Sequence, residues 1–100
     1  MDKKKFEALL EKNKVEDEKA FKLVESGELI WSGKFEPKIG DRVEVTMNSM
    51  GTGTVAGFFK QAGYLGVIVE LDSQPDWHLK QNYKGKPALV FGSEITKKGG

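Results

Sequence analysis

The residues whose types could do chemistry gather between positions 72 and 86. His78 is the only histidine of the chain, and Asp72 and Asp76 lie close to it in the sequence. A histidine beside carboxylates could act as a general acid or base or form part of a metal site, because imidazole titrates near neutral pH and binds metal ions. Both kinds of site need further partners, and the chain has no cysteine to supply a thiolate. We therefore expect a surface histidine, with no catalytic residue, no metal ligand and no cofactor.

The same segment interleaves aromatic and basic side chains. Trp77 and Tyr83 are mixed with Lys80, Lys84 and Lys86. Single-stranded nucleic acids are held by such sets, through base stacking on the aromatic rings and neutralisation of the phosphates by lysines. A protein partner would instead bury one aromatic side chain as an anchor and leave the lysines at the rim. The formal charge of only +1 favours the protein partner, because nucleic-acid-binding domains are usually strongly basic.

Two consecutive aromatic residues add a further candidate to this binding edge. A strand directs Phe58 and Phe59 to opposite faces, so one of them is exposed unless the N-terminal segment covers it. An exposed aromatic side chain would mark an interface. The sequence thus predicts an edge that binds a protein, with RNA or DNA as the alternative partner. The predicted binding residues are Trp77, His78, Lys80, Tyr83, Lys84, Lys86 and Phe58.

Alternating apolar residues predict five short strands that would carry this edge. The expected ranges are 41–47, 52–60, 65–71, 88–91 and 94–96. Gly53 and Gly57 interrupt the second strand, which is typical of a bulge or a tight corner. Because side chains alternate along a strand, the pattern also predicts which residues share the interior. They are Val43, Val45, Val55, Val67, Val69 and Leu89.

Residues 2–26 have the composition and spacing of helix, and Gly27 is a natural C-terminal stop. Apolar residues recur at three- and four-residue spacing in two groups, around Leu10 and around Phe21. A polar stretch separates the groups, which favours two short helices broken near residues 13–17 over a single long one. Their apolar residues need a partner, so we expect this segment to pack on the strands.

The strand pattern from about Lys38 to Lys97 resembles the SH3-like small β-barrel. The openings Gly40-Asp41-x-Val43 and Gly51-x-Gly53-x-Val55 are similar to those of KOW-type modules and of plasmid-borne type II dihydrofolate reductase. The first resemblance implies a binding module, and the second implies a small oligomeric enzyme with its site between subunits. The reductase carries a Val-Gln-Ile-Tyr run where this chain has Ala88-Leu89-Val90-Phe91, so the polar groups that would hold cofactor and folate are replaced by apolar ones. The pattern assigns no single family.

Together these observations predict an α+β chain in which an N-terminal helix or helical hairpin packs on a five-stranded antiparallel SH3-like barrel. The expected division is a helical segment at 1–28, a connector at 29–37, the barrel at 38–97 and a flexible tail at 98–100. We expect a small non-enzymatic binding or regulatory module, with the small oligomeric enzyme as the alternative. The lack of cysteine suits the cytoplasm, and no apolar run reaches the roughly 20 residues that span a membrane. The identity of the partner and the oligomeric state do not follow from the sequence.

Overall fold

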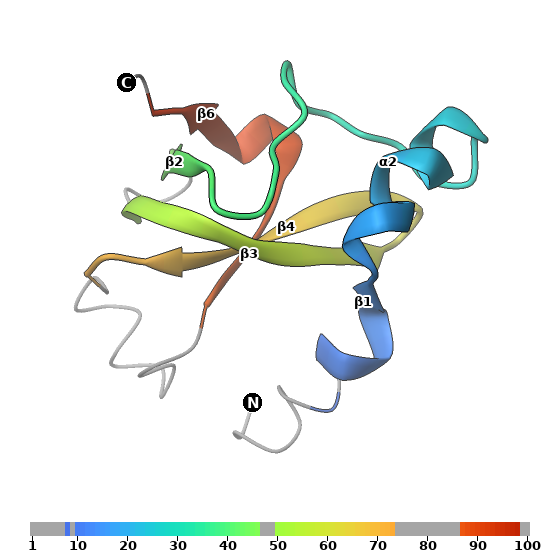
Figure 1. Cartoon of the computed structure of the whole chain (residues 1–100), viewed down its shortest axis with the longest axis horizontal. Coiled ribbons are helices and arrows are strands. Elements are labelled where there is room, and N and C mark those ends of the chain that lie inside the picture. Colours follow the sequence, from blue (N-terminus) through green and yellow to red (C-terminus); the bar gives the residue numbers. More distant parts are fainter. Residues whose placement is uncertain (1–7, 9, 47–49, 74–86, 99–100) are drawn as a thin grey trace.

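An antiparallel sheet organises the chain from residue 42 onward (Figure 1). The computed structural model describes residues 8, 10–46, 50–73 and 87–98. The sheet order is β5-β4-β3-β2-β6, and β1 also pairs with β3. The described elements are β1 (Lys14–Val15), α2 (Asp17–Glu25), β2 (Arg42–Val45), β3 (Gly51–Gln61), β4 (Tyr64–Leu71), β5 (Ala88–Phe91), the 3-10 helix η2 (Gly92–Glu94) and β6 (Ile95–Lys97).

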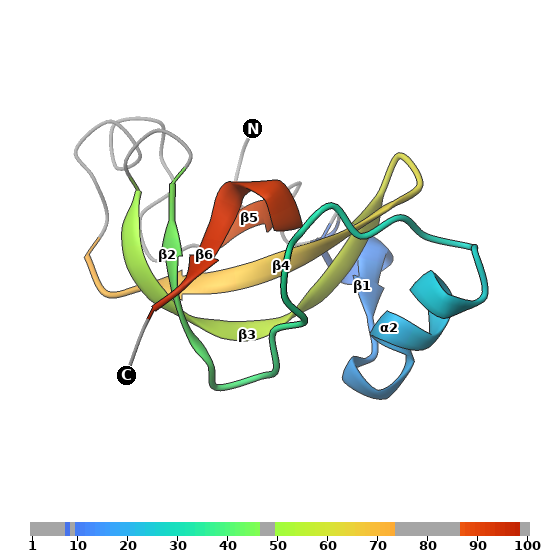
Figure 2. The ribbon, with the colours of Figure 1, turned by 90° about the horizontal axis from the view of Figure 1, so that it is seen from above.

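The predicted α+β class is confirmed, and the strands lie close to their expected positions. The sheet has six strands, because the short β1 adds one that the alternation pattern could not reveal. It is also open: within the described ranges no ladder joins β5 to β6. The closed five-stranded barrel is therefore replaced by an open sheet whose long strands β3 and β4 curve (Figure 2).

The buried face of the sheet is rich in valines from neighbouring strands, and Val55 pairs directly with Val69. Val43, Val45, Val55, Val67 and Val69 are each at most 1% exposed, as predicted. Buried apolar area of this kind is the main source of folding free energy.

The prediction is wrong for Leu89. Val90 pairs with Val67 and Ala88 pairs with Val69, so these two residues enter the core and Leu89 lies on the other face beside Ile68. All four residues of β5 are apolar, so alternation could not fix which ones face inward, and a one-residue slip reverses every side chain.

Close contact between β3 and β4 requires glycine at position 53. A Cβ there would lie 2.4 Å from the carbonyl oxygen of Glu70. Three residues further on, the pairing register shifts between Val55 and Gly57, which leaves Ala56 as the extra residue of a bulge. The predicted interruptions at Gly53 and Gly57 thus correspond to a close strand approach and to a bulge that bends the strand.

The N-terminal segment breaks where the polar stretch predicted. Residues 10–13 are helical, β1 follows, and α2 begins at Asp17. Gly27 ends α2 with a φ of +85°, and its N–H donates to the carbonyl of Val24 at 3.1 Å while the N–H of Glu28 donates to that of Leu23 at 2.9 Å. This pair of hydrogen bonds is a Schellman motif, which satisfies carbonyls at the helix end.

Candidate functional site

The predicted binding edge lies mostly outside the described residues. Its members Trp77, His78, Lys80, Tyr83, Lys84 and Lys86 fall in the range 74–86 and stay predictions.

Phe58, the remaining predicted binding residue, is a core residue. It is 1% exposed, and its ring centroid lies 5.6 Å from that of Phe21 on α2. Phe59 points to the other face but is also buried, because it packs over Gly66 and against Phe91. Phe58 was therefore wrongly predicted to contact a partner: the folded chain already encloses its ring.

Asp72, which the sequence grouped with His78, forms an ion pair with Arg42 in the structure, and His78 and Asp76 lie outside the described residues. The Asp72 carboxylate accepts hydrogen bonds from Arg42, and the same guanidinium donates to the hydroxyl of Thr54 at 2.8 Å. The hydrogen bond to Arg42 lowers the pKa of Asp72, and the reciprocal contact raises the pKa of Arg42. The three residues join β2, β3 and the end of β4 on the polar face of the sheet, so the contact is structural.

A second set of contacts fixes the segment between α2 and β2. The indole N–H of Trp31 donates to the carbonyl oxygen of Phe35 at 3.0 Å, and the Trp31 ring packs edge-on against Phe21. The same ring lies over Gly33, where a Cβ would meet it at 2.6 Å. Trp31 thus holds residues 31–35 in a tight loop whose backbone can approach its neighbours closely.

That loop contacts η2. Figure 2 shows the segment between α2 and β2 passing beside this 3-10 helix. The N–H of Ser93 donates to Oγ of Ser32 at 3.1 Å. The carbonyl of Glu94 in turn accepts from the N–H of Thr46 at 2.8 Å and from its hydroxyl at 3.0 Å. These contacts position the start of β6 between the loop and β2.

A groove of about 380 Å³ lies between the loop and β6. We call it the β6 groove. Its apolar surface includes partly buried Phe35 and Ile95, which is 5% exposed, while Lys34 and Lys97 are exposed lining residues. None of the described residues that line it is acidic, so these residues give the groove a positive local charge. The lining residues are Ser32, Gly33, Lys34, Phe35, Gly92, Ser93, Ile95, Thr96 and Lys97.

One side of the β6 groove is an open strand edge. The N–H of Lys98 donates to Arg42 and the carbonyl of Glu94 accepts from Thr46, so even-numbered residues hydrogen-bond to β2. In an antiparallel ladder the intervening residues direct their backbone groups the other way. Lys97 therefore directs its N–H and C=O away from β2, and within the described ranges β6 pairs with β2 alone.

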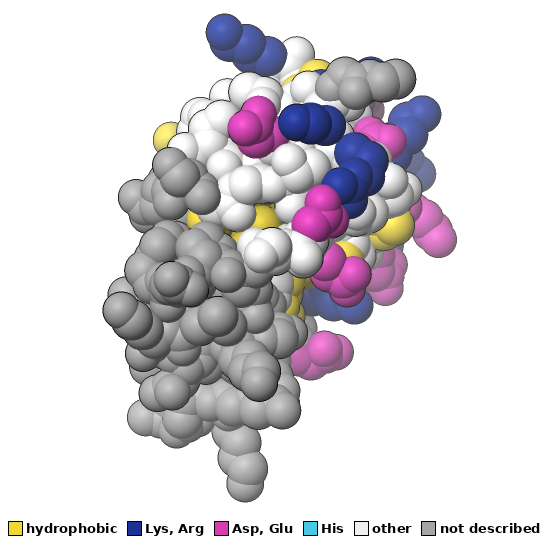
Figure 3. All heavy atoms as spheres, turned by 90° about the vertical axis from the view of Figure 1, so that its left-hand side faces the viewer, with side chains coloured by type: hydrophobic (Ala, Val, Ile, Leu, Met, Phe, Trp, Pro, Cys, Tyr) yellow, Lys and Arg dark blue, Asp and Glu magenta, His cyan; other side chains and the backbone are white. Residues whose placement is uncertain are grey.

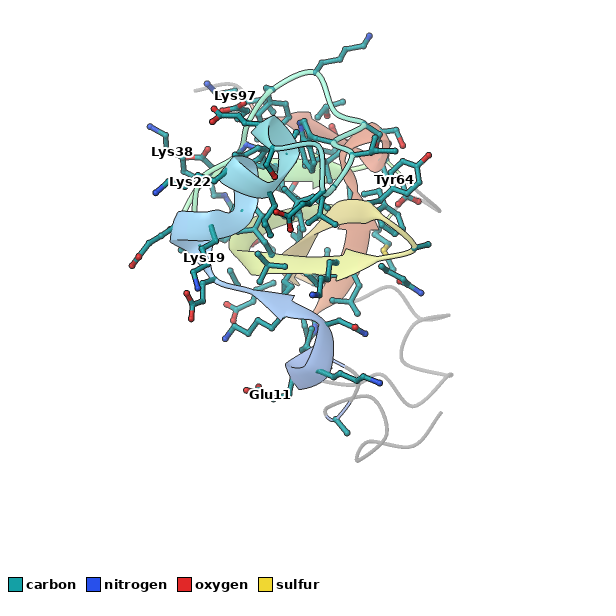
Figure 4. All side chains as sticks on the ribbon, turned by 90° about the vertical axis from the view of Figure 1, so that its right-hand side faces the viewer. Glu11, Lys19, Lys22, Lys38, Tyr64 and Lys97 are labelled. Atoms are coloured by element: carbon teal, nitrogen blue, oxygen red, sulfur yellow. The ribbon has the colours of Figure 1, made fainter. Side chains whose placement is uncertain are left out.

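The surface beyond the groove is mixed in charge. Figure 3 shows basic and acidic side chains interspersed on the face that carries β2 and β6. A separate apolar patch is formed by Ile30, which is 55% exposed, and Tyr64, which is 40% exposed. Figure 4 shows Tyr64 on the opposite side of the molecule from Lys97.

Neither a metal site nor a membrane-spanning helix is found in the part of the chain that the structure describes. No three side chains of the types that ligate metals come together there. No helix in these ranges is long and apolar enough to cross a membrane.

Sequence reasoning missed the β6 groove because its two walls are sixty residues apart. The pairs Ser32-Gly33 and Gly92-Ser93 were visible as small-residue breaks, but nothing local indicates that they touch. Comparison with known protein families, characterised proteins and solved structures finds no match for this chain.

Proposed function

We propose that this protein is a non-enzymatic binding module that holds a segment of a protein partner in the β6 groove. The proposal rests on the combination, in one place, of an apolar surface, basic side chains and an edge of β6 that pairs with no strand within the described ranges. Interfaces of this kind place apolar contacts at the centre and charged side chains at the periphery. The aromatic and basic residues between 77 and 86 are proposed as a second contact region.

The strand pairing supports a finer proposal about the fold. β2 pairs with β3 on one side and with the last strand, β6, on the other, and a 3-10 helix precedes β6. We propose on these grounds that the sheet is a variant of the SH3-like class, opened between β5 and β6. Small sheets of this class serve as scaffolds on which different binding sites are built.

The proposed function is tested by capturing partners on the tagged full chain, with and without nuclease. Lys34→Glu combined with Lys97→Glu reverses the charge of the groove. Lys22→Glu combined with Lys60→Glu is the matched control, because it makes the same change in net charge at exposed positions outside the lining. Both variants are first checked for a native thermal transition.

We expect the tagged chain to capture a protein even after nuclease treatment. The groove variant should fail to capture this protein, and the control variant should still capture it. Loss of the partner on nuclease treatment would instead indicate nucleic acid. Equal capture by the two variants would show that the β6 groove is not the site.

A further inference from the structure

The β6 groove also indicates what kind of segment it binds, and this inference rests on the proposed function. We propose that the ligand is an extended acidic segment of a partner protein that adds to β6 as a new antiparallel strand. Three features of the groove support this: its backbone groups, the alternation of its side chains and its charge.

Strand addition depends on main-chain hydrogen bonds, so it requires backbone N–H and C=O groups on β6 that do not already bond to β2. Lys97 directs both its N–H and its C=O away from β2. The N–H of Ile95 is already bonded to the carbonyl of Gly92 in η2, so Ile95 offers only its C=O. The edge is therefore short, with Lys97 as its central pairing residue, and η2 ends it on one side.

Side-chain alternation then fixes the order of residues in the ligand. Ile95 pairs with Val45 and Lys97 with Val43, so both face the inner side of the sheet, whereas Thr96 faces the outer side with Glu44. A ligand residue opposite Ile95 meets apolar surface that Phe35 continues. The ligand residue opposite Lys97 lies on the same face, two positions away, and faces a positive charge.

Charge complementarity selects the acidic class of ligand. Among the residues that the structure describes, the groove lining carries Lys34 and Lys97 and no carboxylate that could neutralise them. A basic segment would be repelled by these lysines, and a second copy of β6 would bring its own Lys97 to the same place. An antiparallel acidic strand meets Lys97 first and Ile95 two residues later. The expected core of the ligand is therefore Glu-x-apolar, with a β-branched residue at x beside Thr96.

Fluorescence polarisation with synthetic peptides tests the inference on the full chain. The probe is a labelled, capped peptide containing Ser-Glu-Thr-Ile-Thr, compared with one in which Lys replaces Glu and one in which Asp replaces Ile. We expect saturable binding of the first peptide only, weakened by salt. Failure of the first peptide to bind more tightly than the other two would overturn the inference.

Three variants at positions 97 and 98 separate the contribution of charge from that of backbone contacts. Lys97→Glu is expected to weaken binding of the probe by about tenfold, whereas Lys98→Glu, with the same net charge, should change it by less than about twofold. Lys97→Pro removes the outward N–H without breaking the ladder to β2, and it should abolish binding while β2 and β6 stay paired. Native binding by a folded Lys97→Pro variant would overturn strand addition.

These outcomes are distinct from failure of the proposed function. If partner capture depends on Lys34 and Lys97 but no acidic peptide binds, the binding module stands and strand addition is wrong. If the chain self-associates through β6 and the probe does not compete, the occupant is a second copy and the inference is again overturned.

Discussion

The backbone of Gly92 lies so close to that of Gly33 that a Cβ on Gly92 would come within 2.3 Å of the Gly33 nitrogen. This contact joins the loop after α2 to the 3-10 helix before β6, and both glycines line the β6 groove. Gly92 therefore requires glycine because of the Gly33 backbone, whereas Gly33 requires it because a Cβ there would meet the Trp31 ring.

Gly92→Ala should destabilise the protein by about 1–3 kcal/mol, because the added methyl group forces two backbone segments apart. Gly57→Ala is the matched control: its Cβ would only reach Cδ1 of Ile68 at 3.4 Å, so a cost below about 1 kcal/mol is expected. Urea unfolding measures both. Equal stability of the two variants would show that the Gly92 contact is looser than described.

Ala62→Asn should stabilise the β3–β4 hairpin. Ala62 and Gly63 form a two-residue turn between the paired residues Gln61 and Tyr64, and both have positive φ, +53° and +82°. Asparagine adopts this left-handed conformation more readily than alanine, so a gain of about 0.5–1 kcal/mol is expected. The thermal midpoint should rise by a few degrees. Gly63→Ala should lower it, and a lower midpoint for Ala62→Asn would contradict the turn geometry.

Val90→Asp should unfold the protein, whereas Leu89→Asp should leave it folded with reduced stability. Val90 is fully buried beside Val67, and an unpaired charge there costs several kcal/mol. Leu89 is only partly buried on the other face, where a carboxylate can reach water. Circular dichroism and solubility distinguish the two. The reverse order of effects would place Leu89 in the core, as the sequence pattern predicted.

The Arg42–Asp72 ion pair should make stability depend on pH in the acidic range. The pKa of Asp72 is lowered by its hydrogen bond to Arg42, so the carboxylate stabilises the fold above its unfolded pKa of about 3.9. This contribution is lost as the pH falls through the lower folded pKa. Urea unfolding should therefore show wild type more stable than Asp72→Asn at pH 7, with the difference shrinking below about pH 4. A difference that does not change with pH would mean that the pair contributes little, as for many exposed ion pairs.

The strands were predictable because alternation in their sequences is strong. Val43 and Val45 on β2, and Val67 and Val69 on β4, are each spaced two residues apart, as residues that share one face of a sheet must be. The helix break and its stop at Gly27 were predictable for similar local reasons. Leu89 was wrongly placed in the core because all four residues of β5 are apolar, so the sequence does not indicate which of them face inward.

The candidate site was not predictable because it depends on contacts between distant segments. The approach of Gly33 to Gly92 and the hydrogen bond from Ser93 to Ser32 have no local sequence signal. Burial of Phe58 and Phe59 on opposite faces likewise depends on Phe21 from α2 and on the space above Gly66. The local sequence pattern predicts helices and strands, whereas a groove depends on contacts between segments that are distant in the sequence.

Hydrogen exchange at the amide of Lys97 tests the central claim most directly. In the free protein this N–H faces the β6 groove, away from β2, so it should exchange rapidly. Adding the acidic probe peptide or a captured partner should slow its exchange, while the amide of Gly63 in the distant hairpin turn serves as the unchanged reference. Slowed exchange at Lys97 is the predicted result. Unchanged exchange at Lys97 with the ligand demonstrably bound would contradict binding along β6.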